Sequence, residues 1–321
     1  MERFKLKRIL IIRSDRFGEF LLSLAAVKLI KDNFSQSSVS LLAQRSNIEL
    51  IRGINFIDKF IEYDDKAFRG FCGAFKLAKI FRKEKFDCVL ILNPKKEFHL
   101  AAFFAGITLR VGYGRKWGFC LNKKIKDLKY LEQRHEVEYN IELASLICRN
   151  SFIPEVNLPV DRKESLEFLK GNIDFSKQYI AIHPFTSNFL KKIDRQSWRN
   201  LSWELRRNNF ALALIGSGEE KQEATGLASE MGAVNLAGSL SLRNLAAFLK
   251  YHCRAFIGLD SGPLHLASVL KLPVVGLYNS SNPKRWGPYR TKSLVLQEKA
   301  ADDFIKQVDK IFDFILVNSN Q

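Results

Sequence analysis

The sequence predicts an α/β protein made of two doubly wound domains that face a cleft. Apolar runs typical of buried strands alternate with segments whose apolar residues recur at helical spacing. The alternation stops at a polar, proline-bearing stretch at 150–161 and then starts again. At 321 residues the chain is long enough for two domains. We therefore expect an N-terminal domain over 1–160 and a C-terminal domain over 161–321, with the last helix either in the second domain or packed back on the first.

The first half alternates short apolar runs with longer amphipathic segments, the pattern of parallel βαβ units. The first run, Ile9–Ile12, is followed by apolar residues at helical spacing from Phe20 to Ile30. The expected strands are 8–13, 39–43, 59–63, 88–92 and 109–113, and the expected helices are 19–33, 71–83, 97–104 and 136–147.

The second half repeats this order of elements. The clearest unit is FIGLDSGPLHLASVLKLPVVGLY (256–278), where a buried strand, a short turn and a helix precede another strand. The expected strands are 179–183, 211–216, 255–258 and 274–278, and the expected helices are 195–207, 219–231, 242–250 and 263–270.

The composition is that of a soluble globular protein, with 46% apolar and 26% charged residues. No apolar run approaches the roughly 20 residues that span a bilayer, and the run at 9–12 is too short for a signal peptide. We expect a cytoplasmic protein. The five cysteines and five histidines show no ligand spacing, so we expect reduced, mostly buried thiols and no metal site.

The net charge of +17 is concentrated in the first half, where 29 lysines and arginines face 17 carboxylates. Such an excess favours an anionic partner: nucleic acid, a phosphorylated substrate or an anionic membrane surface. A solvated basic surface is the plainer interpretation. The segment 115–129 is denser in charge and interleaves Trp117 and Phe119, so we expect it to face the partner through Arg115, Lys116, Lys123, Lys124 and Lys126.

The turn after the first strand does not bind a dinucleotide. It contains only Gly18, whereas a dinucleotide site needs G-x-G-x-x-G to let backbone N–H groups approach a pyrophosphate. The helix also begins with a carboxylate, Glu19, which would repel a phosphate.

In the second half, polar residues follow the strand ends, where open α/β sheets bind ligands. The turn Asp260-Ser261-Gly262 precedes Pro263, and the N–H groups of this helix start would form an anion site suited to a diphosphate, although helix capping alone would also explain these residues. Two further strand ends offer His183, Thr186, Ser187 and Lys191, and Glu220 beside a Gly-Ser-Gly turn. Together they suggest a nucleotide-sugar site, and without a D-x-D at a strand end Lys191 would replace a metal ion.

These motifs, in this order from about residue 8 to residue 290, resemble glycosyltransferase family 9, the lipopolysaccharide heptosyltransferases. The family's R-x-D-R-x-G-D is similar to the stretch from Arg13 to Glu19, and its D-S-G-P-x-H-L-A is matched in full from Asp260 to Ala267. Its H-P-G-x-x-x-x-x-K-R-W, H-x-V-E and W-G-P-Y motifs are echoed at His183, Pro184, Lys191 and Trp198, at His135-Glu136-Val137, and at Trp286-Gly287-Pro288-Tyr289. Three residues depart from the family: Glu19 replaces aspartate, Phe185 replaces glycine and Ile193 replaces tryptophan.

The resemblance implies a GT-B fold and metal-independent, inverting transfer of a sugar, heptose from ADP-heptose above all, to a lipopolysaccharide core or related glycolipid. Glu19 would be the general base, kept ionised by the helix dipole, with Asp15 as its rival and Lys191 neutralising the leaving diphosphate. The donor would bind His183, Thr186, Ser187, Lys191, Glu220, Asp260, Ser261, Gly262 and His265, although His265 could serve packing alone. The acceptor would bind Arg13, Arg16, Arg115, Lys116, Lys123 and Lys124.

The resemblance further implies no cofactor besides the sugar nucleotide, no nucleic-acid partner, and peripheral association with the cytoplasmic face of an anionic inner membrane. Two other classes of function stay open on the sequence. One is a basic nucleic-acid-binding protein, although the basic residues form no continuous patterned helix. The other is a sugar-nucleotide epimerase on the same architecture, which would need no acceptor.

Overall fold

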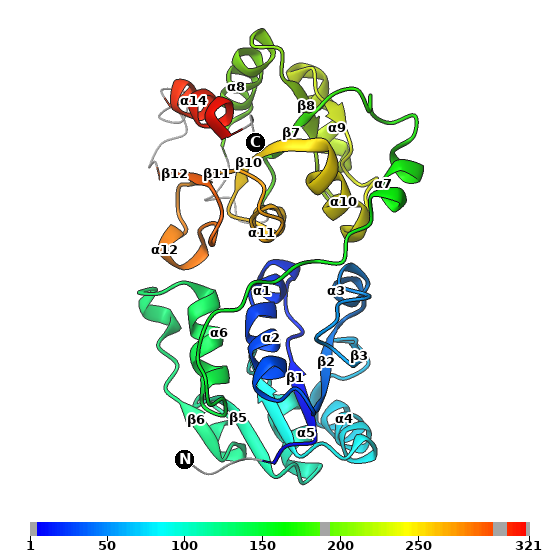
Figure 1. Ribbon diagram of the computed structural model, residues 1–321, viewed down its shortest axis with the longest axis vertical. Coiled ribbons are helices and arrows are strands. Elements are labelled where there is room, and N and C mark those ends of the chain that lie inside the picture. Colours follow the sequence, from blue (N-terminus) through cyan, green and yellow to red (C-terminus); the bar gives the residue numbers. More distant parts are fainter. Residues whose placement is uncertain (1–4, 187–192, 298–306, 319–321) are drawn as a thin grey trace. The chain divides into compact units, whose positions relative to one another are not determined.

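The computed structural model describes residues 5–186, 193–297 and 307–318, and the chain divides into two compact units, Met1–Val156 and Asn157–Gln321 (Figure 1). The division falls inside the polar stretch at 150–161 that marks a linker in the sequence. Each unit is built around a sheet of its own.

The sheet of the first unit is parallel and has six strands within the described residues, in the order β3-β2-β1-β4-β5-β6. The winding reverses between β1 and β4, which lie side by side in the register Ile9↔Cys88. These central strands are almost wholly apolar because helices cover both of their faces. The strands are β1 (Arg8–Ile12), β2 (Ser38–Gln44), β3 (Lys59–Tyr63), β4 (Cys88–Ile91), β5 (Leu109–Tyr113) and β6 (Lys123–Ile125).

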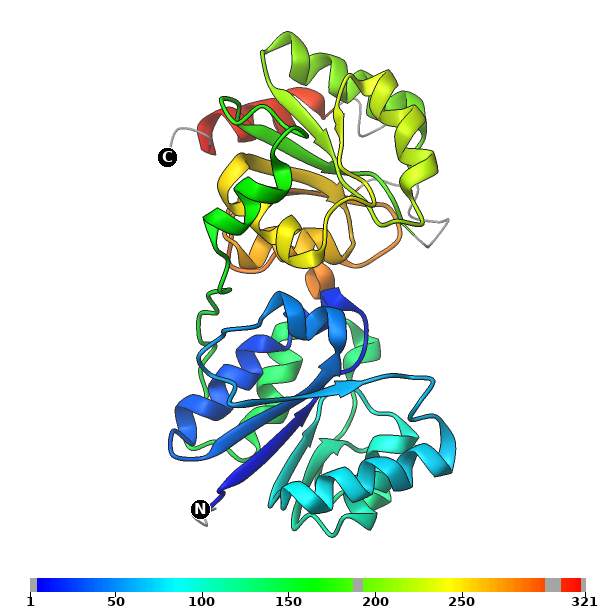
Figure 2. The ribbon, with the colours of Figure 1, turned by 90° about the vertical axis from the view of Figure 1, so that its right-hand side faces the viewer.

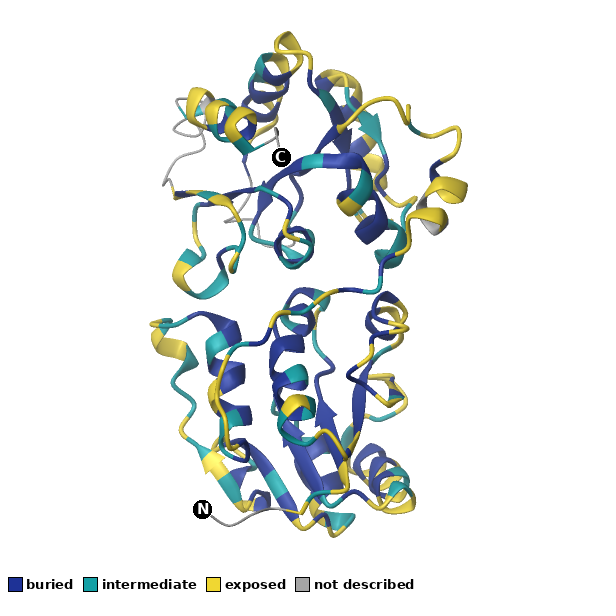
Figure 3. Ribbon diagram, viewed as in Figure 1, coloured by how far each residue is buried: buried dark blue, intermediate teal, exposed yellow. Residues whose placement is uncertain are grey.

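Helices cover the two faces of this sheet in pairs. α2 packs against α6 on one face, and α4 packs against α5 on the other, where Leu10, Ile12 and Phe81 belong to one buried cluster (Figures 2 and 3). The helices are α1 (Phe17–Leu21), α2 (Leu24–Asn33), α3 (Arg45–Leu50), α4 (Gly70–Glu84), α5 (Lys96–Phe104) and α6 (Glu136–Ser145), with single 3₁₀ turns η1 (Gly118–Cys120) and η2 (Lys129–Leu131).

The second unit repeats this plan on a parallel sheet of six described strands in the order β12-β11-β10-β7-β8-β9. Here the winding reverses between β7 and β10, which pair in the register Gly258↔His183. The strands are β7 (Tyr179–His183), β8 (Ala211–Leu214), β9 (Val234–Asn235), β10 (Cys253–Leu259), β11 (Val274–Tyr278) and β12 (Ser293–Gln297).

The last helix packs within the second unit. Its residues Ile311 and Ile315 belong to the same buried cluster as Trp198 and Leu205 of α8, so its apolar face is covered there. Of the two places that the sequence left open for it, these contacts favour the second unit. The helices of this unit are α7 (Arg162–Leu169), α8 (Arg195–Arg207), α9 (Lys221–Met231), α10 (Leu242–His252), α11 (Gly262–Val269), α12 (Pro283–Trp286) and α14 (Val308–Asn318).

The prediction of a single helix over 19–33 is wrong in one respect, because the structure divides this segment between α1 and α2. Ser23 Oγ donates to the carbonyl oxygen of Phe20 at 2.6 Å, and this local bond competes with helical pairing.

Short elements escaped the sequence analysis altogether: β6, β9, β12, α3, α7 and α12. Strand β6 lies at the end of the strand order, within the basic segment 115–129, and lysines on an edge strand also discourage pairing with other chains.

All five cysteines are free thiols, as the sequence predicts. Four are buried, and burial raises the pKa of Cys88, Cys120, Cys148 and Cys253. Only Cys72, on the outer side of α4, is exposed.

Candidate active site

In the first unit, the turn after β1 lies at the point where the winding reverses, a position that binds ligands in doubly wound sheets. Side chains from neighbouring strand ends hold this turn in place. Asn93 accepts from the backbone N–H of Ser14 and donates to its hydroxyl, both at 3.1 Å. Gln44 donates to the Ser14 carbonyl at 3.0 Å, and Asn47 donates to the Asp15 carbonyl at 3.4 Å. The backbone of Ser14 and Asp15, at the start of the turn, is therefore held by protein groups alone.

Arg13 is buried, with 2% of its side chain exposed, and it positions other groups. Its Nε lies 2.7 Å from Asp15 Oδ1, and its Nη1 lies 3.6 Å from Glu136 Oε1 and donates to Asn140 on α6 at 3.5 Å. Lys129 completes the cluster by donating to Glu136 Oε1 at 2.5 Å. Its guanidinium is buried against protein carboxylates, which gives it a positioning role, and the expectation that Arg13 binds the acceptor stays a prediction.

Asp15 and Glu19 form a pair of partly buried carboxylates at the end of β1. Burial raises the pKa of Glu19, and the charge of Asp15 raises it further, against the lowering effect of backbone hydrogen bonding, Arg13 and Arg16. Burial also raises the pKa of Asp15, although Arg13 opposes it. The sequence analysis expected the start of α1 to keep Glu19 ionised, and this stays a prediction: a hydrogen bond from the Glu19 backbone does lower the pKa, but burial is the larger effect and the net shift is upward.

Arg16 is exposed at the N-cap of α1 and stays a prediction for acceptor binding. Of the other predicted cations, Arg115 pairs with Asp127 at 3.1 Å and Lys124 donates to the Gly118 carbonyl at 3.3 Å. Lys123 is half-buried and Lys116 is exposed. Their role toward the acceptor also stays a prediction.

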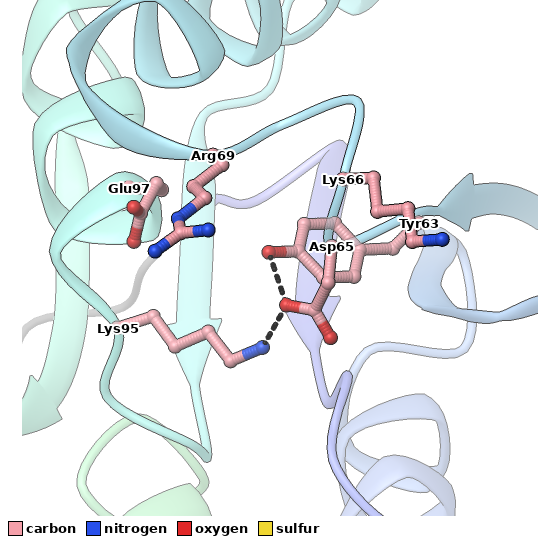
Figure 4. Close-up of a pocket in the computed structure, with 6 residues that line it drawn as sticks. All are labelled: Tyr63, Asp65, Lys66, Arg69, Lys95 and Glu97. Atoms are coloured by element: carbon pink, nitrogen blue, oxygen red, sulfur yellow. Dashed lines mark hydrogen bonds and ion pairs between the residues drawn. The ribbon is translucent and has the colours of Figure 1, made fainter.

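A cavity of about 420 Å³ lies beside the ends of β3 and β4, and the sequence analysis missed it (Figure 4). Lys95 pairs with Asp65 at 2.6 Å, and Tyr63 donates to the same carboxylate at 3.1 Å. Glu97 accepts from the backbone N–H of Gly70 at 2.8 Å and so fixes the start of α4. The lining residues are Tyr63, Asp65, Lys66, Arg69, Lys95 and Glu97. Cations directly after the strand-like runs 59–63 and 88–92 are the signal in the sequence that could have revealed this cavity.

In the second unit, His183 connects three strand ends. It is the last residue of β7, which lies between β8 and β10 in the sheet. Its Nδ1 is 3.0 Å from Ser261 Oγ after β10, and its Nε2 is 3.8 Å from Glu220 Oε2 after β8. An Nε2–H directed at the carboxylate leaves Nδ1 to accept from the Ser261 hydroxyl. The structure thus brings together three of the predicted donor-binding residues at the reversal point of this sheet.

Glu220 is held as a carboxylate by its neighbours. Burial works against its ionisation, but hydrogen bonds from His183 and from the backbone N–H of Ser217, the latter at 2.6 Å, lower its pKa to about 2. Glu220 itself therefore closes the Gly-Ser-Gly turn. It holds the shape of this loop in addition to any contact with a ligand.

Asp260, just before α11, and His265, within α11, form a further close pair. Asp260 Oδ1 lies 3.7 Å from His265 Nε2, and the His265 ring lies 6.4 Å from the Trp286 ring. Ser261 is the N-cap of α11 and makes no side-chain cap bond; Gly262 is the first helical residue and Pro263 follows it. The N–H groups of the first turn thus start directly after β10, where the sequence predicts an anion site.

Two of the residues that depart from the family pattern are part of the core. The Phe185 ring is buried and lies edge-on to His183 at 5.9 Å, and it is also close to Gly216, where an added Cβ would meet it at 3.0 Å. Ile193 is buried in the same hydrophobic cluster as Phe185. Thr186 is half-buried, whereas Ser187 and Lys191 lie outside the described residues.

Comparison with known proteins decides the family. A family model described as glycosyltransferase family 9 (heptosyltransferase) matches residues 74–309. The chain belongs to glycosyltransferase family 9. This family membership selects a glycosyltransferase from the three classes of function that the sequence left open.

Individual relatives agree with this assignment. The chain is 25% identical, over 94% of its length and 88% of the relative's, to the lipopolysaccharide core heptosyltransferase OpsX of Haemophilus influenzae. Its fold is similar to that of E. coli ADP-heptose lps heptosyltransferase II, with a TM-score of 0.81, 19% identity, and coverage of 96% of this chain and 98% of that one. It is also similar to E. coli heptosyltransferase WaaC with ADP-2-deoxy-2-fluoro heptose, with a TM-score of 0.72, 18% identity, and coverage of 95% and 99%. The predicted fold class, α/β of the GT-B type with two doubly wound sheets, is confirmed.

Proposed function

We propose that this family 9 glycosyltransferase transfers heptose from ADP-heptose to an anionic acceptor of the lipopolysaccharide core, with inversion and without a metal ion. The proposal rests on two polar sites, one in each unit, at the point where the winding of the sheet reverses. One presents two partly buried carboxylates after β1, and the other presents His183, Ser261 and the start of α11 after β7 and β10. A base and a diphosphate site are what glycosyl transfer from a sugar nucleotide requires.

The donor is assigned to the second unit. N–H groups at the start of α11 and the Ser261 hydroxyl would bind the diphosphate, while Asp260 would accept from sugar hydroxyls and Glu220 from ribose. The related structures with ADP and an ADP-sugar analogue support adenine as the nucleobase of the donor. Lys191 would compensate the charge that develops on ADP as it leaves.

The chemical step is a direct displacement. Glu19 takes the proton of the acceptor hydroxyl while that oxygen forms a bond to the anomeric carbon of heptose. The bond from that carbon to the diphosphate oxygen breaks, and ADP leaves with the bonding electrons. Attack opposite the leaving group inverts the anomeric configuration. The raised pKa of Glu19 suits this role, since a more basic carboxylate accepts a proton more readily.

The cavity beside β3 and β4 supports an anionic acceptor. Lys66, Arg69 and Lys95 line it, against the carboxylates Asp65 and Glu97. Guanidinium and ammonium groups bind carboxylates and phosphates, the anionic groups of an inner lipopolysaccharide core. We assign acceptor recognition to this cavity together with Arg16.

Sugar-nucleotide specificity tests the proposal directly. In a thermal-shift panel of ADP-, UDP- and GDP-sugars, ADP-heptose is expected to raise the melting temperature most, because a ligand that binds only the native state stabilises it. At a concentration of 100 times Kd the gain is about 2.7 kcal/mol. Equal shifts from all three nucleotides, or none from ADP-heptose, would contradict the donor assignment.

Metal independence is a separate expected outcome. The described residues contain no group of three or more His, Cys, Asp or Glu side chains arranged to hold a metal ion. Dialysis against EDTA is expected to leave heptose transfer unchanged, as measured by ADP release. Activity lost in EDTA and restored by Mg²⁺ or Mn²⁺ would show that a cation, and not Lys191, compensates the leaving diphosphate.

A further inference from the structure

Large aromatic side chains are exposed on one part of the first unit. Phe71 and Phe75 on α4 are 55% and 52% exposed, Phe103 on α5 is 49% exposed, and Phe119 on η1 is 68% exposed. Figure 2 shows α4 along the outside of this unit. A soluble protein tolerates single exposed aromatic residues, but a contiguous group of them marks an interaction surface.

Helical spacing and ring contacts join these residues, because Phe71 lies one helical turn before Phe75 on the same face of α4. Phe75 stacks on Phe104 with ring centres 4.7 Å apart, and Phe104 meets Phe103 at 6.0 Å. Trp117 lies 5.7 Å from Phe119, and both Trp117 and Phe104 pack on the same small buried cluster. We call the group Phe71, Phe75, Phe103, Phe104, Trp117 and Phe119 the aromatic surface.

Cations accompany the aromatic surface, and carboxylates are scarce there. Along α4 the charged residues are four cations and one carboxylate, Glu84 at its end, and both Lys76 and Lys79 are exposed. Lys96 Nζ lies 4.7 Å from the Phe71 ring centre. The segment 114–126, which contains η1, carries five cations and no carboxylate. The partner of this surface is therefore expected to be anionic and to offer apolar contact as well.

We propose that the aromatic surface docks on the headgroup region of an anionic phospholipid bilayer. The inference rests on the proposed function, because a lipid-borne acceptor lies in such a surface. Aromatic rings gain apolar contact at the boundary of headgroups and acyl chains, while lysine side chains extend along the rings and keep their ammonium groups beside lipid phosphates. No described helix is both long and apolar enough to cross a bilayer, so this contact would be peripheral.

Vesicle binding tests the proposal. The full-length protein is expected to co-sediment with vesicles of phosphatidylglycerol and phosphatidylcholine, and to bind pure phosphatidylcholine at least tenfold less. The double variant Phe71→Ser/Phe75→Ser is expected to lower the partition coefficient at least tenfold. In Lys76→Gln/Lys79→Gln the loss is expected to be about 25-fold, since each cation near an anionic surface contributes about 1 kcal/mol, or roughly fivefold.

A matched variant controls for the loss of an exposed aromatic ring. Trp203 on α8 of the second unit is 57% exposed and lies outside the aromatic surface, so Trp203→Ser is expected to bind vesicles like the parent. Melting temperatures within a few degrees of the parent would show that the α4 variants fold.

Three outcomes would overturn the proposal. The first is equal binding to neutral and anionic vesicles, and the second is unimpaired vesicle binding by both α4 variants. The third is a parent that binds no vesicles but forms a dimer, which the double phenylalanine variant abolishes. The last would make the surface an interface between two copies of the chain. The shift given by ADP-heptose separates this proposal from the proposed function, because the α4 variants should retain it. A parent that binds anionic vesicles but not ADP-heptose would contradict the function alone.

Discussion

Glu19→Gln is expected to lower turnover by about 10²–10⁴-fold, which is the usual contribution of a general base. Glutamine keeps the size and hydrogen bonding of the side chain but cannot accept the proton of the acceptor hydroxyl. Donor affinity is expected to change little, because we assign ADP-heptose to the second unit. Steady-state kinetics with ADP-heptose and a separate titration with ADP would measure both quantities.

The pH dependence gives a second signature of the same residue. Burial raises the pKa of Glu19 above the usual value of about 4.3. A base works only when deprotonated, so kcat/KM is expected to fall as the pH drops through this raised pKa. In Glu19→Gln this acidic limb should disappear from the residual activity.

Two further variants distinguish Glu19 from Asp15. Glu19→Asp keeps a carboxylate with a shorter reach and is expected to retain partial activity. Asp15→Asn removes the neighbouring carboxylate at the same strand end. If Asp15→Asn abolishes turnover while Glu19→Gln does not, the base is Asp15. Parent-like rates in both variants would mean that the reaction needs no protein base.

Arg13→Met is expected to lower the free energy of unfolding by about 3–5 kcal/mol, the usual cost of removing one partner from a buried ion pair. Arg13 and Glu136 are both 2% exposed, and Asp15 would lose the cation that lies 2.7 Å from its carboxylate. Such a loss is a large share of the stability of an ordinary domain, about 5–15 kcal/mol. Urea unfolding followed by tryptophan fluorescence and circular dichroism would measure it.

Arg115→Met is the matched control. Arg115 also pairs with a carboxylate, Asp127 at 3.1 Å, but its side chain is 56% exposed. Exposed pairs contribute about 0–1 kcal/mol, so this variant should unfold close to the parent. Similar losses in both variants would contradict the assignment of Arg13 as a buried positioning residue.

The sequence predicted the main elements well because their signals are local. β3, β5, β7, β11 and α8 have the expected bounds: β7 and β11 are mostly apolar runs, β3 and β5 have apolar residues beside charged ones, and α8 is amphipathic. Elements with weak local signals were missed: β6 is a lysine-rich edge strand of three residues, and β9 has two. Pairing with a neighbouring strand, and not composition, makes these segments extended.

The site was predictable where it depends on strand order and not where it depends on burial. Residues at the ends of β7, β8 and β10 meet because those strands are neighbours, and the sequence grouped them correctly. The burial of Arg13 and the rise in the pKa of Glu19 depend on α6 and on the packing around the turn, which a single sequence does not reveal. The cavity beside β3 and β4 was missed because its cations are separated by about 30 residues along the chain.

The uneven exposure of the thiols makes the natural chain suitable for site-specific labelling. A maleimide reacts with thiolates, and burial both shields Cys88, Cys120, Cys148 and Cys253 and raises their pKa. Cys72 alone is exposed, so brief treatment of the folded protein should attach one fluorophore per chain. A solvatochromic dye placed there needs no engineered cysteine and would report the polarity around α4 in real time.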